Sequence, residues 1–296
     1  MATELINQRL SWEVDGADWP NRVASRFIDV AGSRLHVQQM GQGPMALLLH
    51  GTGASTHSWR DFAPLLARRF NVVAPDLPGH GFSAMPLLPQ GSSLPGMADI
   101  LGAMLRQLGE EPALVIGHSA GAAILLRMAL DRTIAPRCLV SLNGALLPLQ
   151  GAAGQFFSPV ARLLVQNTLA PRLFAWRAGQ PGVIEKVLSD TGSTIEKRGI
   201  ELYQRLARNP AHVQGALAMM ANWDLPSLSR EMDGLKLPLL LVVGGNDRTI
   251  PSEDAFRVRD RLPTTRIEYL RKLGHLAHEE RPDDVEKLII RFYEEG

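Results

Sequence analysis

Three polar side chains, far apart in the sequence, have the types and the chain order that acyl transfer requires. Ser119 stands at the centre of Gly-His-Ser-Ala-Gly, Asp247 follows in "VVGGNDRTIP", and His275 comes last, in "LGHLAHEERP". A serine hydroxyl is a weak nucleophile until a base takes its proton, and a histidine base needs an acid to orient its ring. The pattern predicts Ser119 as the nucleophile, His275 as the base and Asp247 as the orienting acid.

Each of these roles has an alternative in the sequence. Ser119 could be an ordinary turn serine, because glycine and serine are common in turns. His278 lies three residues after His275 and competes with it, although His275 comes sooner after the last predicted strand. Asp247 could be a turn aspartate that caps the next element. The other position for the acid, after the strand at 138–142, carries Asn143, which cannot serve as an anion.

The charged oxygen of a tetrahedral intermediate needs two backbone donors. The pattern assigns them to the amide of Ala120, directly after the nucleophile, and to the amide of Thr52 in "HGTGAST". This loop begins Gly51-x-Gly53, as dinucleotide-binding loops do, but Thr56 stands where the third glycine should be. The sequence contains no G-x-x-x-x-G-K-[ST] motif and no Cys/His cluster with zinc-ligand spacing, so we expect no metal and no cofactor.

These residues need strands and helices to position them, and the hydrophobic pattern predicts both. "RFIDV" and "RLHVQQM" alternate polar and apolar residues around "AGS", which is typical of an antiparallel hairpin. Short apolar runs then alternate with helical segments, which indicates a mostly parallel sheet covered on both faces. The predicted strands lie at 26–30, 34–40, 46–50, 71–76, 113–117, 138–142, 238–245 and 266–270, and the helices at 58–70, 94–109, 120–131, 252–262 and 282–296. Ser119 would occupy a sharp strand-to-helix turn that exposes its Oγ.

A long segment separates the strands at 138–142 and 238–245. Its length excludes a simple loop, and its composition is that of helices. We therefore predict a helical cap at 146–236, inserted into a core domain that consists of 1–145 and 237–296.

The cap carries side chains that suit a bulky ligand. Flat aromatic residues and flexible methionines fit a large planar molecule, although packing of the cap onto the core is the more ordinary explanation. Between 155 and 224, eight basic and five acidic residues leave a surplus of three positive charges, which propionate groups would match. Ordinary solvated helix faces would show the same surplus. The candidate substrate contacts are Phe157, Trp176, Met219, Met220 and Trp223.

Composition excludes several classes of protein. Of the 296 residues, 45% are hydrophobic and 21% charged, and a net charge of +1 gives no reason to expect nucleic acid as a partner. No apolar run approaches the roughly 18 residues of a membrane span, and the N-terminus lacks the pattern of a secretory signal. Cys138 has no second cysteine to pair with, which favours a reducing compartment. We expect a cytoplasmic protein, with peripheral membrane contact as the open alternative.

Several motifs occur in a fixed order along nearly the whole chain: "HGTG", "DLPGHGFS", "GHSAG", "GGNDRTIP" and "GHLAHEERP". With them the sequence resembles the α/β-hydrolase fold superfamily, which implies a mostly parallel eight-stranded sheet flanked by helices, with an inserted cap. Ser119 argues against the haloalkane dehalogenase and epoxide hydrolase types, which carry aspartate there. The chain is also similar to the magnesium-chelatase accessory proteins of bacteriochlorophyll biosynthesis, in "HGTGASTHSWRDFAPLLARRF", "GHSAGAAILLRMAL", "VSLNGALLPL" and "NPAHVQGALAMMANWDL".

The narrower resemblance implies a place in a tetrapyrrole pathway, beside the insertion of magnesium into protoporphyrin IX. With the three candidate residues, it leads us to expect a serine hydrolase that cleaves an ester or related acyl bond of a large apolar substrate, such as a tetrapyrrole. One alternative is a non-catalytic protein that binds or delivers a porphyrin and has magnesium chelatase subunits as its partners. Another is a hydrolase that cleaves a carbon–carbon bond.

Overall fold

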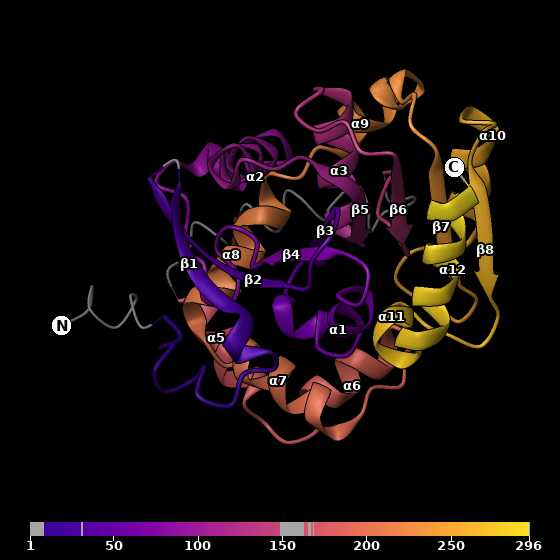
Figure 1. Ribbon diagram of the computed structural model, residues 1–296. Coiled ribbons are helices and arrows are strands. Elements are labelled where there is room, and N and C mark those ends of the chain that lie inside the picture. The colour runs from indigo at the N-terminus through magenta and orange to yellow at the C-terminus, as the bar shows by residue number, and fades with distance from the viewer. Residues whose placement is uncertain (1–8, 31, 149–162, 165–166, 168, 296) are drawn as a thin grey trace.

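Figure 1 shows the computed structural model, which describes residues 9–30, 32–148, 163–164, 167 and 169–295. Its centre is an eight-stranded sheet in the order β1-β2-β4-β3-β5-β6-β7-β8. The strands are β1 (Ser25–Val30), β2 (Ser33–Met40), β3 (Met45–Leu49), β4 (Asn71–Pro75), β5 (Pro112–His118), β6 (Cys138–Leu142), β7 (Leu239–Gly244) and β8 (Arg266–Leu270). β2 is antiparallel to both of its neighbours, and the other adjacent strands are parallel. The predicted mostly parallel sheet and N-terminal hairpin are confirmed.

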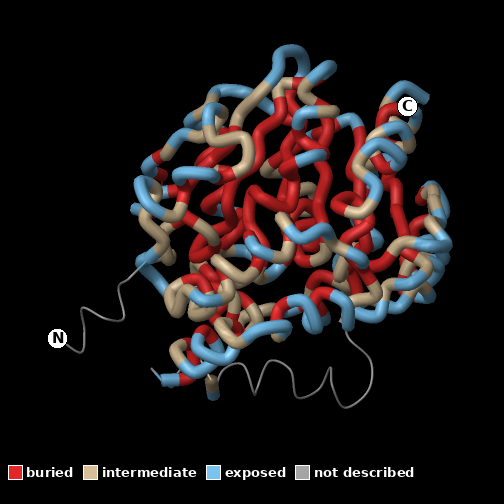
Figure 2. Tube along the Cα trace, turned by 90° about the horizontal axis from the view of Figure 1, so that it is seen from below, coloured by how far each residue is buried: buried red, intermediate tan, exposed pale blue. Residues whose placement is uncertain are grey.

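Helices cover both faces of this sheet. α2 (Leu94–Leu108), α3 (Ala120–Leu130) and α10 (Glu253–Arg261) pack on one face, and α1 (Phe62–Leu66) and α12 (Pro282–Glu295) pack on the other. Successive side chains of a strand point to opposite faces, so a covered parallel strand such as β3 is buried at every position. Figure 2 shows this core, with buried residues along the central strands and exposed residues along the outer turns.

The segment at 58–70 is not the single helix that its pattern predicts. It forms a short 3-10 helix, η3 (Thr56–Trp59), followed by α1, which has only five residues. Pro64 explains the break, because it has no amide hydrogen and its ring would clash with the carbonyl of Arg60 in a continuous helix. The four residues of η3 are all buried.

Between β6 and β7 the chain forms helices, as its composition predicts. The described ones are α5 (Ala170–Ala178), α6 (Val183–Asp190), α7 (Lys197–Ala207), α8 (Pro210–Ala221) and α9 (Leu225–Glu231). In Figure 1, α5, α7 and α6 lie in a row below the sheet, whereas α9 lies beside α3 at the opposite end. Leu225 and Leu228 of α9 join the same hydrophobic cluster as the strands. The limits of the cap at 146 and 236 stay a prediction.

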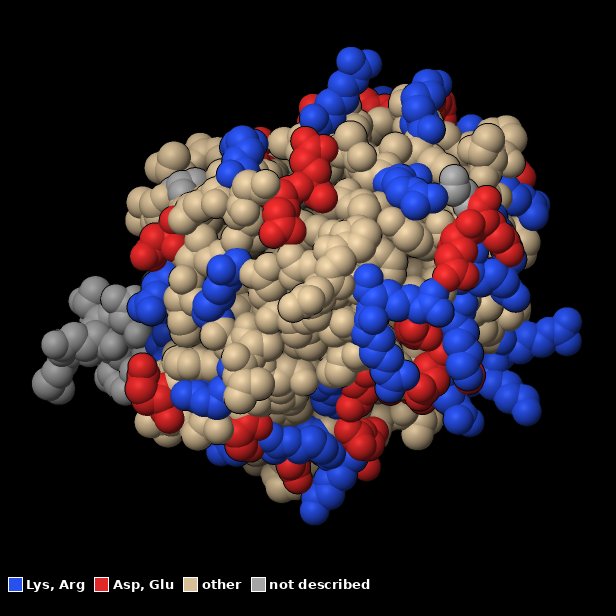
Figure 3. Space-filling view, in the orientation of Figure 1, with Lys and Arg blue, Asp and Glu red and all other residues tan. Residues whose placement is uncertain are grey.

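The surface mixes charges of both signs. On the face drawn in Figure 3, lysine and arginine alternate with acidic residues around a central area without charges. Within the part of the chain that the structure describes, no helix is both long and apolar enough to cross a bilayer. The same residues contain no group of three His, Cys, Asp or Glu side chains placed to hold a metal ion.

Candidate active site

Ser119 occupies the sharp turn between β5 and α3. Its φ of 50° and ψ of −117° lie in a region that L residues rarely adopt, so the turn holds the serine under backbone strain. Two glycines allow the neighbouring chain to pack closely against this turn. A Cβ on Gly121 would lie 2.2 Å from the Leu49 carbonyl oxygen, and one on Gly117 would lie 2.4 Å from the Ala122 amide nitrogen. The two glycines of Gly-x-Ser-x-Gly therefore allow β5, α3 and β3 to approach one another closely.

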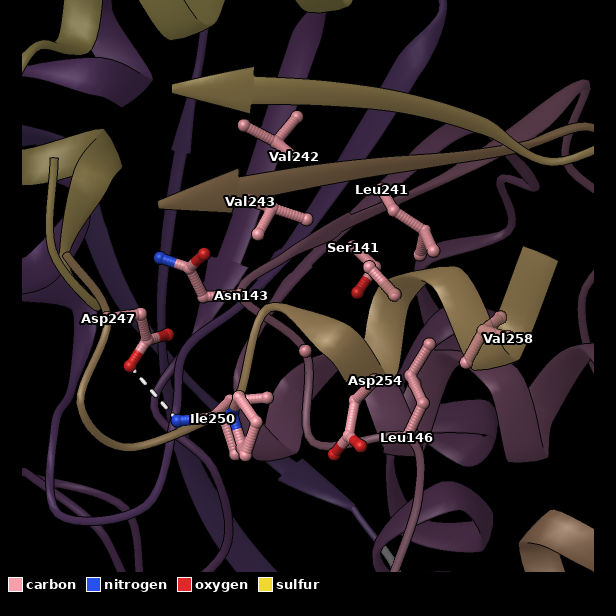
Figure 4. Close-up of a pocket in the computed structure, with 13 residues that line it drawn as sticks. Ser141, Asn143, Leu146, Leu241, Val242, Val243, Asp247, Ile250, Asp254 and Val258 are labelled. Carbon is pink, nitrogen blue, oxygen red and sulfur yellow. Dashed lines mark hydrogen bonds between the residues drawn. The ribbon is translucent and has the colours of Figure 1, made fainter. Parts of the chain in front are cut away.

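His275 and Asp247 meet as a hydrogen-bonded pair. Nδ1 of His275 lies 2.8 Å from Oδ2 of Asp247, and the two side chains are only 8% and 1% exposed. The other carboxylate oxygen of Asp247 accepts from the amides of Thr249, at 2.7 Å, and Ile250, at 3.0 Å; Figure 4 shows the Ile250 bond at the edge of a small cavity. Because a carboxylate only accepts, Nδ1 carries the hydrogen and Nε2 is left bare to act as a base.

The amides of Thr52 and Ala120 are available as oxyanion donors. Neither amide donates a hydrogen bond to any residue that the structure describes. Ala120 is the first residue of α3, where the positive end of the helix dipole favours negative charge. The Thr52 loop packs closely against Ser119, since a Cβ on Gly51 would lie 3.0 Å from the Ser119 Cβ. The two predicted donors thus belong to segments that meet at the serine turn.

His118 connects the serine turn to the histidine loop. Its Nε2 lies 3.0 Å from the carbonyl oxygen of His275, and the two rings are 4.7 Å apart. This contact brings Ser119, the next residue, into the neighbourhood of His275. No hydrogen bond joins the Ser119 hydroxyl to His275 or to any other described residue, and such bonds often form only when substrate is bound.

The competing histidine, His278, is buried close to His275, and its ring centroid lies 4.7 Å from that of His118. Its Nε2 is 2.8 Å from the Ser58 hydroxyl of η3, and its ring packs against Trp59. Burial, together with the neighbouring His275 and Arg60, lowers its pKa to about 3, so the ring stays neutral. The structure thus places Asp247 against His275 and gives His278 a packing position, inside α11 (Ala277–Glu280).

Asn143 is a supporting residue that sequence reasoning missed. Its Oδ1 accepts from the Gly244 amide at 2.6 Å, and its Nδ2 donates to the carbonyl oxygens of Gly274 and His275, both at 2.8 Å. Gly244 ends β7 and leads to Asp247, so this one side chain spans the acid loop and the base loop. Asn143 also has a φ of 44°, which asparagine tolerates better than most residues. An asparagine, which tolerates this φ, directly after β6 was the only local signal of its supporting role.

Asn143→Asp tests this support. A carboxylate at 143 would place a second acceptor against the two carbonyl oxygens, so we expect the free energy of unfolding to fall by about 2–4 kcal/mol at pH 7. The pKa of that buried carboxyl would be raised, so the folded state binds the proton more tightly. The loss should be complete above the folded pKa, shrink as the pH falls below it, and lose its charge-dependent part below the unfolded pKa of about 3.9.

Urea unfolding of both proteins at pH 7 and pH 5 measures the difference. The native protein, measured at each pH, is the reference, because the other carboxyl groups titrate in both proteins. A variant as stable as the native protein at pH 7 would show that the Asn143 amide bonds contribute nothing.

A short segment between β6 and β7 contacts the loops that carry His275 and Asp247. The Ser193 hydroxyl accepts from the Leu276 amide at 2.8 Å, beside the histidine, and the Thr191 carbonyl accepts from the Arg248 amide at 3.1 Å, beside the aspartate. The packing is equally close, since a Cβ on Gly274 would lie 2.4 Å from the Ser193 amide nitrogen. The 191–194 segment therefore belongs to the site, although nothing in its sequence predicts chemistry.

The predicted substrate contacts fall in different environments. Met219 is fully buried, and its sulfur accepts from the Thr52 hydroxyl at 3.4 Å, which places α8 against the oxyanion loop. Met220 follows it, half-buried, and Trp223 packs partly buried against the main hydrophobic cluster. Trp176 is 63% exposed on α5. Phe157 lies outside the described residues.

Comparison with known proteins finds relatives along almost the whole chain. A family model described as "Alpha/beta hydrolase family" matches residues 46–288. The "Magnesium-chelatase 30 kDa subunit" of Rhodobacter capsulatus is 38% identical over 283 residues, which cover 94% of this chain and 97% of that protein. The "2-hydroxy-6-oxo-6-phenylhexa-2,4-dienoate hydrolase" of Burkholderia cepacia is 23% identical, and the match covers 92% of this chain and 97% of that protein.

Solved structures have the same architecture. An alpha/beta hydrolase fold protein from Burkholderia ambifaria, 25% identical, superposes with a TM-score of 0.74 and covers 90% of this chain and 97% of that one. The epoxide hydrolase CorEH, 22% identical, reaches a TM-score of 0.78 and covers 92% and 98%. At 22% identity the likeness shows the fold alone.

Proposed function

This chain belongs to the alpha/beta hydrolase family, and from that premise we propose that it is a serine hydrolase with Ser119, His275 and Asp247 as its catalytic residues. Its substrate is an ester or related acyl bond of a large apolar molecule, in the magnesium-porphyrin part of bacteriochlorophyll biosynthesis. The observation that carries the proposal is the 2.8 Å contact between His275 and Asp247, in a site that also holds Ser119 in a strained strand-to-helix turn.

In the proposed reaction, Ser119 Oγ attacks the acyl carbonyl while Nε2 of His275 takes the serine proton. Asp247 holds the ring in the required tautomer and stabilises the imidazolium that forms. The carbonyl oxygen becomes an anion, and the amides of Thr52 and Ala120 donate to it. His275 then returns the proton to the leaving group, and a water molecule repeats the sequence to release the acid.

Two alternatives rest on the names of relatives. The Rhodobacter capsulatus relative is named as a magnesium-chelatase subunit, which favours a protein that binds or delivers a porphyrin without cleaving it. The Burkholderia cepacia relative is named as a hydrolase of a dienoate, which favours carbon–carbon bond cleavage. The hydrogen-bonded pair beside a serine turn supports an enzyme, because a carrier needs neither an oriented base nor free oxyanion donors.

Labelling with a fluorophosphonate tests the nucleophile directly. We expect mass spectrometry to find the label on Ser119 and to find none on the Ser119→Ala protein. Ser189→Ala, an exposed serine of α6, is the matched control and should label like the native protein. A folded native protein that takes up no label would contradict the serine hydrolase and leave the carrier alternative.

The position of α8 supports a substrate site beneath the cap. Because Met219 contacts Thr52, the helix lies directly beside the proposed oxyanion donors. Met220 and Trp223 follow on the same part of the chain, and their flexible and flat side chains suit a tetrapyrrole ring. We propose Met219, Met220 and Trp223 as substrate contacts on these grounds.

Titration with protoporphyrin IX tests this substrate class. Tryptophan fluorescence should be quenched saturably, and Trp223→Ala should weaken binding by about 1–3 kcal/mol, the usual loss for a buried aromatic contact. Ser119→Ala should bind as the native protein does, because the serine acts on the transition state. N-acetyltryptophanamide corrects for absorption by the porphyrin, and thermal unfolding checks that the Trp223 variant is folded. Absence of saturable quenching at micromolar porphyrin would remove tetrapyrroles from the site.

A further inference from the structure

Helix α8 holds the tip of the loop that carries Thr52. Within the described part of the chain, the hydrogen bonds of Thr52 and Gly53 all go to this helix. The Thr52 hydroxyl donates to the Met219 sulfur at 3.4 Å, and the Gly53 carbonyl oxygen lies 3.1 Å from Nε2 of His212. His212 and Met219 are seven residues apart, so they lie on one face of α8. The loop tip therefore depends on a helix from the segment between β6 and β7.

The partners of the His212 ring fix the position of its hydrogen. Nδ1 lies 3.0 Å from the amide nitrogen of Gly81, which can only donate, so Nδ1 accepts and carries no hydrogen. The residue is 4% exposed, and burial lowers its pKa to about 4, so the ring is neutral at pH 7. The single ring hydrogen is therefore on Nε2, which donates it to the Gly53 carbonyl.

The loop that contains Gly81 gives this ring a rigid anchor. Asp76 Oδ2 accepts from the Phe82 amide at 2.9 Å, and a Cβ on Gly81 would lie 2.3 Å from the same oxygen. Helix α8 packs just as closely on this loop, since a Cβ on Gly215 would lie 1.9 Å from the Gly79 carbonyl oxygen. The core thus fixes both the helix and the ring that holds Gly53.

Thr52 lies between two carbonyls that histidines hold. The Gly51 carbonyl accepts from Nδ1 of His50, in the core, at 2.8 Å, and the Gly53 carbonyl accepts from His212. Gly53 has a φ of 75°, and a Cβ there would meet nothing within 4 Å. A glycine with so much free space has several backbone conformations open to it once its carbonyl is released. Rotation at Gly53 would displace the adjoining Thr52 amide.

We propose that His212 is a positioning residue for the hydrolysis: its Nε2–H holds the Gly53 carbonyl and thereby keeps the Thr52 amide directed at the oxyanion. This inference rests on the proposed function and deepens it. Because His212 belongs to α8, the oxyanion site is complete only while that helix is packed on the core. In this role His212 does not touch the substrate and acts on the reaction through the loop.

Two substitutions separate the two bonds of the ring. Glutamine puts a donor near the position of Nε2, whereas asparagine keeps an acceptor near Nδ1 and is too short to reach Gly53. We expect His212→Asn to lower kcat for p-nitrophenyl butyrate by about 10–100-fold and to change KM by less than about threefold, because a displaced oxyanion donor weakens the transition state alone. His212→Gln should keep about a third or more of the native kcat.

Gln214 provides the matched control. It is half-buried on α8, two residues after His212 and therefore on a different face of the helix. Gln214→Asn makes the same change in length between the two amide side chains, and it should keep the native kcat and KM. Thermal unfolding checks that each variant is folded.

Nuclear magnetic resonance supplies a second measurement, made on the native protein. Long-range nitrogen–proton spectra of protein with isotope-labelled histidine should show the His212 ring neutral at pH 7, with its hydrogen on Nε2. The signal is identified by its loss in whichever His212 variant is folded.

Three outcomes would overturn the positioning role. They are equal kcat values for the asparagine and glutamine variants, a loss confined to KM, and a His212 ring that is protonated or carries its hydrogen on Nδ1. Fluorophosphonate labelling of the native protein separates this failure from that of the proposed function. If Ser119 is labelled and one of the three occurs, only the role of His212 falls. If the native protein takes up no label, the hydrolase and the positioning role fall together.

Discussion

Ser119→Ala should lower kcat/KM for a small activated ester by about 10⁴-fold or more, because the members of a catalytic triad act as a unit. Alanine keeps the Cβ, so the strained turn at φ 50° has no reason to change. The remaining turnover should be close to that of the oxyanion donors and bound water alone. Hydrolysis of p-nitrophenyl butyrate, followed by the absorbance of the released nitrophenolate, measures this turnover.

Ser189→Ala, on α6, is the control for loss of a hydroxyl, and it should keep native activity. Thermal unfolding of the Ser119 variant excludes loss of fold as the reason for low activity. A Ser119→Ala protein with more than a tenth of native kcat/KM would mean that another group attacks the ester.

Asp247→Asn should lower kcat by about 10³–10⁴-fold while leaving the fold in place. The amide of asparagine would face Nδ1 of His275 with a donor, so the ring would carry its hydrogen on Nε2, where a base must be bare. Substrate affinity should change little, because the ring's tautomer matters to proton transfer and not to ground-state packing. Steady-state kinetics at several pH values separate the loss in kcat from any change in KM.

Asp254→Asn is the matched control for this change. Asp254 is a buried aspartate of α10 that lines the same cavity, as Figure 4 shows, but it pairs with Arg257 and not with His275. It should retain most activity. If Asp247→Asn were as active as Asp254→Asn, the acid would be a different carboxylate.

Elements with a simple local pattern could be predicted closely. β6 and β8 begin and end at the predicted positions, 138–142 and 266–270, because short runs of strand-forming residues between turn signals have few other conformations. The turn at Ser119 follows from the same kind of reasoning, since its two glycines are required by contacts with chain next to them. The prediction of a single helix at 58–70 was wrong because Pro64 interrupts a segment whose hydrophobic spacing is helical.

Supports that join distant segments could not be predicted. Asn143 was excluded as an anion, yet its contacts with Gly244 and Gly274 span 101 and 131 residues, and no local pattern carries that information. Trp176 shows a second limit. It was predicted as a substrate contact from its aromatic type, and residue type does not show whether a side chain faces the core or the solvent, where Trp176 is 63% exposed.

The contacts of the 191–194 segment bear on how such proteins can be rebuilt. Exchange of caps between relatives is a direct route to new specificity, because the predicted cap is a single insertion in the chain. Here a chimaera that replaced everything between β6 and β7 would also remove the Ser193 acceptor of the Leu276 amide and the close packing on Gly274. The recipient protein would then lose contacts that order its own His275 loop, whatever substrate the new cap binds. A graft that keeps 191–194 from the recipient and exchanges only the helices around it avoids this fault.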